Sequence, residues 1–182
     1  MALSRKTRSV GTGAFLTACF VLGISAALHA QQSPSLPYHP DATLVEVMDA
    51  IIMPAANSLW NAIAVDVTPE GIVEKGPETD EDWATLRASA VELAEASNLI
   101  VIPGRAVAAP DVESPEYELS PTQISELMQS HWSDWVAHSE ALHRVAQTSI
   151  LMIDARNAKG LSDAGGDLDA ACESCHQQFW YP

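Results

Sequence analysis

Apolar residues recur every three or four positions in four stretches of the chain, and this spacing places them on one face of an α-helix. The first stretch begins near Asp41 or Ala42 and ends around Val65. Pro54 lies inside it and cannot donate a hydrogen bond to the carbonyl of Ala50, so we expect a kink or a break into two helices. The apolar stripe of this helix contains Leu44, Met48, Ile51, Ala55 and Leu59.

Two further stretches, 79–103 and 120–157, open with residues that stabilise helix N-termini. Thr79 precedes three acidic residues, which complement the positive end of a helix dipole. Ser120 precedes a proline and, three positions on, Gln123, the spacing of a capping box. We expect one unbroken helix in each stretch. The stripes contain Trp83, Leu86, Ala90, Leu93, Ser97 and Ile100 in one helix, and Ile124, Met128, His131, Trp135, His138, Leu142, Val145, Ser149 and Met152 in the other.

The last helix is expected after a short break at 158–160. Its stripe contains Ala164, Leu168, Cys172, Cys175 and Phe179. The glycines at 165–166 either allow close packing or mark a later helix start. The proline- and glycine-bearing segments 66–78 and 105–119 are typical of loops, the second at the surface and mobile. No segment alternates with period two, so the sequence predicts an all-α fold, an antiparallel four-helix bundle.

The first 30 residues are typical of a secretory signal peptide, with a basic start, a long apolar run and small residues near Ala30. The length of the run keeps an uncleaved membrane anchor open, and Cys19 keeps lipoprotein processing open. We expect cleavage, which leaves 31–182 as one domain and directs it to the periplasm. The only cysteines of that domain are the two in its last stretch, so a disulfide framework is not expected.

The chain is strongly acidic, with 24 Asp and Glu against 9 Lys and Arg and a net charge of −15. Removal of the basic signal segment would make the charge more negative. Such a surface repels nucleic acid and anionic membranes. It favours a basic protein partner, or serves only to keep the domain soluble.

Candidate chemistry is concentrated in Cys172-Glu173-Ser174-Cys175-His176, a C-x-x-C-H motif that is typical of covalent c-type haem attachment. The two thiols form thioethers with the porphyrin, and His176 binds the iron. Helical positions i, i+3 and i+4 share a face, so all three side chains can reach one haem. A thioredoxin-type disulfide or a zinc site is an alternative. Against the disulfide, the sequence has no βαβ pattern before the motif. Against zinc, it has no second pair of ligands of the usual kind.

Four helices with the haem motif on the last one resemble the class II c-type cytochromes, the cytochrome c-prime superfamily. The resemblance covers 43–179. Two segments are also similar to a divergent exported group within that class, namely Met48-x-x-Ile51-x-x-Pro54-Ala55 and Phe179-Trp180-Tyr181-Pro182. The resemblance implies one covalent haem c near the C-terminus of a four-helix cytochrome c domain.

The resemblance also bears on the sixth ligand of the iron. In the low-spin branch of the class, a methionine of the first helix binds opposite the histidine, and Met48 matches that place. Met48 could instead be a core side chain, as most methionines on such stripes are. Met53 is the next candidate, but its spacing turns it to another helix face. Cytochromes c-prime leave the sixth position open and typically carry a cation four residues after the histidine, where this chain has Trp180.

These features predict a periplasmic electron carrier, not an enzyme, whose iron cycles between Fe(III) and Fe(II) with His176 and Met48 as axial ligands. The alternative is a five-coordinate protein that binds nitric oxide or carbon monoxide. Expected partners are redox proteins such as a periplasmic dehydrogenase or oxidase, and homodimers are common among the relatives. His131 and His138 are expected to be core or boundary residues, with contact to a haem propionate or iron ligation as the alternative.

Overall fold

The computed structural model describes residues 38–69 and 71–181, and this part of the chain is mostly helical. The signal segment predicted over 1–30, including Cys19, lies outside the described residues, as do residues 31–37. Among the described residues, no helix is both long and apolar enough to cross a membrane. The predicted predominance of helix is therefore confirmed for this part of the chain.

The first helical run is continuous but changes its hydrogen-bond register. It consists of α1 (Leu44–Val47), the π-helical turn η1 (Met48–Ile52) and α2 (Met53–Trp60). The amide of Met53 donates to the carbonyl of Met48, five residues back, and the backbone dihedrals at both ends of the turn stay helical. Pro54 follows at once and has no N–H for the carbonyl of Ala50. The wider turn absorbs this defect, so the proline neither breaks the run in two nor leaves it a regular α-helix.

The segment 66–78 is not simply the loop that its proline and glycine predict. Strands β1 (Ala64–Thr68) and β2 (Gly71–Lys75) form an antiparallel hairpin, with Val67 opposite Ile72. The β-branched residues of both strands favour this extended conformation. Gly71, with φ of 136°, adopts a backbone conformation at the turn that other residues rarely enter. The fold class all-α is therefore correct only for the rest of the described chain.

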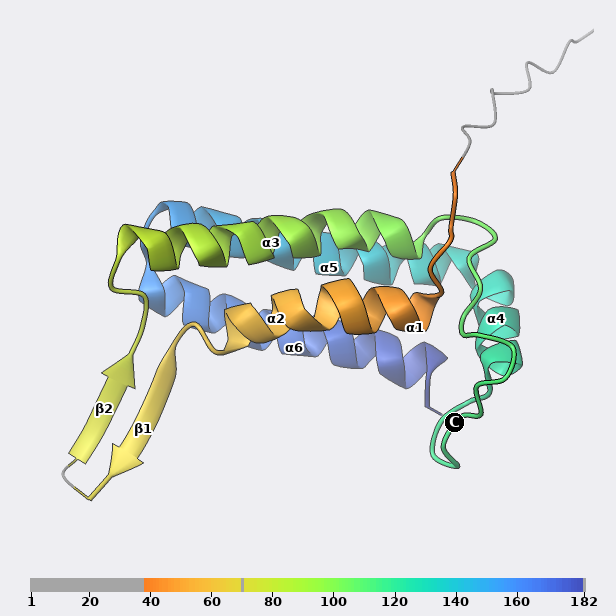
Figure 1. Cartoon of the computed structure of the whole chain (residues 1–182), viewed down its shortest axis with the longest axis horizontal. Helices are drawn as coiled ribbons and strands as arrows, with labels where there is room; N and C mark the ends of the chain where they lie inside the picture. The colour runs from red at the N-terminus through yellow and green to blue at the C-terminus, as the bar shows by residue number, and fades with distance from the viewer. Residues whose placement is uncertain (1–37, 70, 182) are drawn as a thin grey trace, which may run out of the picture. The chain divides into compact units, whose positions relative to one another are not determined.

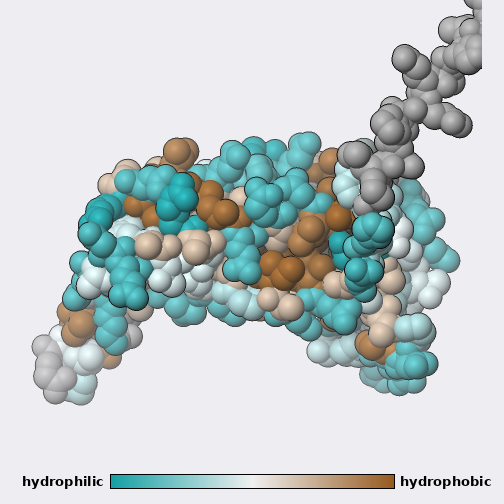
Figure 2. Space-filling view, turned by 45° about the horizontal axis from the view of Figure 1, so that its top comes forward, coloured by the Kyte–Doolittle hydropathy of each residue, from teal (hydrophilic) through white to brown (hydrophobic). Residues whose placement is uncertain are grey.

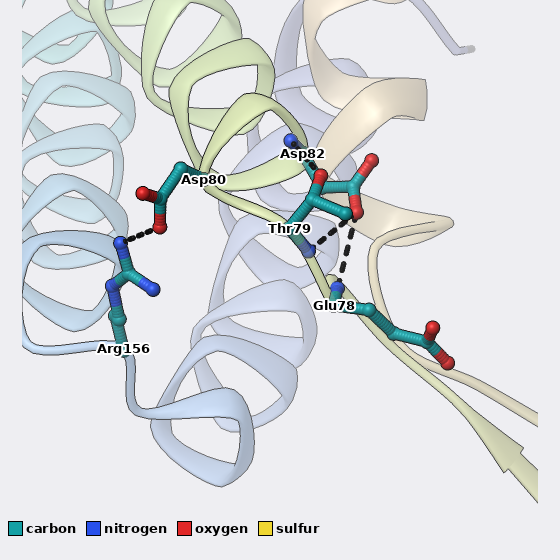
Figure 3. Close-up of polar contacts among 5 residues, drawn as sticks. All are labelled: Glu78, Thr79, Asp80, Asp82 and Arg156. Carbon is teal, nitrogen blue, oxygen red and sulfur yellow. Dashed lines mark hydrogen bonds and ion pairs between the residues drawn. The ribbon is translucent and has the colours of Figure 1, made fainter.

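Helix α3 (Asp80–Ile100) begins where the sequence predicts. The Thr79 hydroxyl accepts from the Asp82 amide, and the Asp82 carboxylate accepts from the amides of Thr79 and Glu78 (Figure 3). Asp80 pairs with Arg156, which precedes the last helix. All six residues of the predicted stripe are buried, which confirms the periodicity argument for this helix.

The third predicted helix is two helices, which corrects the expectation of one unbroken segment. They are α4 (Pro121–Ser130), capped by Ser120 as predicted, and α5 (Trp132–Asp154). His131 between them has φ of −123° and ψ of 41°, outside the helical region, and is exposed rather than part of the apolar stripe. The Ser130 hydroxyl donates to the carbonyls of Glu126 and Leu127, which helps to end α4.

The last helix, α6 (Ala158–Phe179), includes residues 158–160, where the sequence predicted a break. The chain reverses instead at Arg156, whose φ of 50° is left-handed. The Asn157 side chain then caps α6 by accepting from the amide of Gly160. Both glycines at 165–166 lie inside the helix, so they do not delay its start.

Four helical segments pack side by side: α3 against α5, α5 against α6, and α2 against both α3 and α6 (Figure 1). Their buried faces form one hydrophobic core. Its largest fully buried side chain is Trp135 on α5, which is 1% exposed and meets Phe179 of α6 edge to face, with ring centres 5.1 Å apart. On the face drawn in Figure 2, hydrophilic residues border smaller hydrophobic areas.

The connection 101–120 is hydrogen-bonded to the start of the first helical run. Leu44 and Val45 donate their amides to the carbonyls of Ala106 and Val107 at 2.8 and 3.0 Å, so the connection satisfies donors that a helix N-terminus leaves unpaired. Val107 itself is 6% exposed. The prediction of a surface loop therefore holds for most of its residues but not for this contact.

We expect Gly166→Ala to stabilise the protein, because Gly166 lies inside α6 and an added Cβ would meet no atom within 4 Å. The gain should be roughly 0.5–1 kcal/mol, the usual advantage of alanine over glycine inside a helix. Urea unfolding of the purified protein measures it. Gly160→Ala is the matched comparison, because its Cβ would overlap the Met152 sulfur and lie 2.6 Å from Asn157 Nδ2. A stabilising effect at Gly160 equal to that at Gly166 would contradict this explanation.

Candidate functional site

A cavity of about 220 Å³ lies between the first helical run, α5 and α6. Its walls bring together the residues that the sequence singled out far apart: Met48 from η1, and Cys172, Cys175 and His176 from α6. The wall is completed by Ile52, Met53, Ala56, Trp60, Ile100, His138, Leu142, Asp169, Ala171 and Glu173. Most of these side chains are apolar, so the cavity suits an apolar ligand with a few polar attachment points.

Helix α6 explains why the three motif residues share the cavity. Cys172, Cys175 and His176 occupy positions i, i+3 and i+4, and Phe179 anchors the same face in the core at 1% exposure. Both cysteines are partly buried and are free thiols. The helix therefore presents two thiols and one imidazole to the same space, as the spacing predicts.

The environment keeps both thiols protonated. Burial, with the nearby Asp169 carboxylate, raises the pKa of Cys172 to about 11. Burial, with the neighbouring Cys172, raises the pKa of Cys175 to about 12. A reactive redox cysteine works as the thiolate, which a positive environment favours. In this cavity, burial instead raises the pKa of both thiols.

The imidazole of His176 is partly buried, and burial lowers its pKa, while the carboxylates of Glu173 and Glu118 act in the opposite direction. Its ring lies 6.2 Å from the Trp180 ring and 6.3 Å from the Tyr181 ring, centre to centre. The His176 carbonyl accepts from the amides of both these residues, which ends α6. A neutral imidazole is the form that ligates iron, so burial suits this role.

Both methionines of the first run line the cavity, which corrects the expectation that Met53 faces elsewhere. Five residues of regular α-helix turn the chain by roughly 500°, well past the starting direction. In the π-turn, the backbone amide of Met53 instead donates to the carbonyl of Met48. This hydrogen bond brings residue i+5 back near residue i. Met48 is partly buried, whereas Met53 is 44% exposed. Met48 is therefore the deeper of the two thioethers.

The two histidines of the third predicted helix differ in position. His138 lines the cavity, and its Nε2 is 2.7 Å from the side-chain oxygen Oε1 of Gln178. The side-chain Nε2 of Gln178 in turn donates to the Asp134 carboxylate at 3.2 Å, so Oε1 is the atom left to accept from His138 Nε2. His131 contacts the Ser130 hydroxyl outside the cavity. Contact with a bound group is thus open to His138 alone of this pair.

Sequence reasoning missed Trp60, which forms part of the cavity wall. Its indole N–H donates to the carbonyl of Gly165 at 3.1 Å and so links α2 to α6. The absence of a side chain at Gly165 is not essential, since an added Cβ would lie 3.8 Å from the Trp60 ring, an ordinary contact. Because the partner is a backbone carbonyl 105 positions away, no local pattern indicates this contact.

No protein-family model and no curated protein matches this chain. Among solved structures, the chain is similar to a cytochrome c′ described as having an unusual ligand-controlled dimer dissociation. The two are 18% identical, the similarity covers 81% of this chain and 100% of that one, and the TM-score is 0.47. A similarity of this degree assigns neither a family nor a function, so the function proposed for this chain rests on its own residues.

Proposed function

We propose that this chain is a mono-haem c-type cytochrome that carries electrons. Cys172 and Cys175 would hold haem c through thioethers, and His176 and Met48 would bind its iron. One observation carries the proposal: an imidazole and two thiols on one helix and a thioether on another line the same largely apolar cavity. The proposed architecture is that of a four-helix bundle whose cofactor site is built from facing helices.

The donor set fits haem c better than the alternatives. Addition to a porphyrin vinyl group uses a thiol and its proton, and both cysteines are kept in the thiol form by burial. A thioredoxin-type redox pair would instead need a stabilised thiolate. The partly buried imidazole and the thioether complete a set of soft and borderline donors suited to haem iron.

Haem bound at this site supplies an iron that accepts and releases one electron. The thioether of Met48 favours the reduced state and so raises the reduction potential. Ile52, Ala56 and Leu142 are buried apolar residues of the cavity wall and would limit the access of water to the bound group. No substrate needs to be transformed, so the proposed role is not enzymatic. The signal-like segment at 1–30 supports export, and we include the periplasm in the proposal on that ground alone.

The proposed ligand Met48 is tested by replacing each cavity methionine with alanine. The parent protein and Met53→Ala should give a low-spin ferric spectrum with a methionine–iron charge-transfer band. Met48→Ala should lose that band completely, because the deeper thioether is gone. Visible and near-infrared absorption of the oxidised proteins measures this. Met53→Ala is the matched control, since it changes the same residue type on the same wall.

Three results would count against parts of the proposal. Loss of the band in Met53→Ala but not in Met48→Ala would reassign the ligand. A high-spin parent protein that binds carbon monoxide readily would favour the gas-binding alternative. A purified protein without covalent haem would refute the proposed cofactor.

A further inference from the structure

The residue that follows α6 connects the proposed haem site to a distant loop. Trp180 donates its indole N–H to the Glu118 carboxylate at 3.1 Å. The carbonyl of Trp180 accepts from the amide of Leu119 at 2.8 Å. Both partners belong to the connection that precedes α4, more than 60 positions earlier in the chain. The two bonds hold a carboxylate of the connection against the end of the haem motif.

Trp180 also places this carboxylate close to the proposed iron ligand. The amide of Trp180 donates to the His176 carbonyl at 2.8 Å, and its ring centre lies 6.2 Å from the imidazole. Glu118, Trp180 and His176 thus form a chain of three neighbouring side chains.

Glu118 and Trp180 are both partly buried, which limits screening of the charge by solvent. The donor that Glu118 receives here is a neutral indole N–H. Such a hydrogen bond stabilises the carboxylate and fixes its position without neutralising it. Its negative charge therefore remains available to the neighbouring imidazole.

We propose that Glu118, held in place by Trp180, is a positioning residue that lowers the reduction potential of the haem ligated by His176. This inference rests on the proposed haem attachment. The oxidised site carries one more positive charge than the reduced site, so a nearby fixed negative charge stabilises the oxidised state. Glu118 thus opposes the effect of the Met48 thioether and sets the potential below the value that the axial ligands alone would give.

The second carboxylate that acts on His176, Glu173, differs in origin. It lies on α6 within the haem motif itself, so its distance from His176 follows from helix geometry. Glu118 comes from a separate segment, and its distance depends on the contact with Trp180. Removal of that contact should therefore release the effect of Glu118 and leave that of Glu173.

The test is the midpoint potential of the haem-loaded protein, measured by spectroelectrochemistry in three variants. Glu118→Gln keeps an acceptor for the indole N–H and removes only the charge, so the potential should rise. Trp180→Phe keeps an aromatic ring but frees the carboxylate to solvent, so a smaller rise is expected. Glu116→Gln, an exposed carboxylate of the same segment, is the matched control and should leave the potential close to that of the parent.

The inference is overturned if Glu118→Gln shifts the potential no more than Glu116→Gln does, or lowers it. If Glu118→Gln yields too little folded protein, an unchanged potential in Trp180→Phe overturns it equally. Haem staining of the denatured parent protein distinguishes a failure of this inference from a failure of the proposed function. A parent without covalent haem refutes the cytochrome, whereas a haem-bearing parent with unshifted variants refutes only the role of Glu118.

Discussion

A variant with both Cys172 and Cys175 replaced by alanine is expected to carry no covalent haem. These are the free thiols of the described chain, and both face the same cavity. Without them no thioether can form, although His176 remains available to ligate haem noncovalently. Haem staining after denaturing electrophoresis, together with the mass of the intact chain, measures the loss. Each single variant should retain one thioether at most.

Cys19→Ala is the control for this experiment, because it removes the remaining cysteine of the sequence and leaves the motif intact. It should retain covalent haem. The same variant bears on the alternative of lipoprotein processing, since loss of membrane attachment in Cys19→Ala would support that alternative. Haem staining that persists in the double variant would contradict attachment through the motif.

Trp135→Ala is expected to cost about 3–5 kcal/mol of unfolding free energy, the range for removal of a large aromatic side chain from a packed core. The Trp135 ring packs edge to face on Phe179, which belongs to α6, the helix that carries the C-x-x-C-H motif. Its indole N–H donates to the Ile100 carbonyl at 3.0 Å, where α3 ends, so truncation also leaves this acceptor unpaired. Chemical denaturation followed by far-ultraviolet circular dichroism measures the change.

Trp132→Ala is the matched control, because Trp132 lies on the same helix but is 39% exposed. Its replacement should cost much less than that of Trp135. A third variant, Trp135→Phe, keeps most of the packing and isolates the lost hydrogen bond, for which about 1–3 kcal/mol is expected. Equal losses at 132 and 135 would show that the aromatic core does not stabilise the fold as described.

Local signals in the sequence predicted much of the fold. The caps at Thr79 and Ser120 depend on residues three positions away, and both form as expected. The break at His131 was missed because the apolar spacing continues across it, and the change of direction depends on what each half packs against. The hairpin was missed because Pro69 and Gly71 favoured a loop, although the flanking β-branched residues favour strands.

The candidate site was predictable only on the side formed by one helix. The positions of Cys172, Cys175 and His176 follow from helical geometry, and the structure brings them to one cavity. Met48 was singled out through a resemblance, and its place on the same cavity depends on how the first helical run packs against α6. The place of Met53 was predicted wrongly, because no spacing rule anticipates a π-turn.

The sequence by itself determined the helical periodicity, the caps and the haem-attachment motif, since each depends on residues within a turn or two of one another. The tertiary structure decided which thioethers line the same cavity as that motif and which carboxylate bonds to Trp180 beside His176. Trp60 with Gly165 and Glu118 with Trp180 are contacts between segments 105 and 62 positions apart. Such contacts form only when separate segments pack together around a shared core, so the local spacing of residues does not predict them.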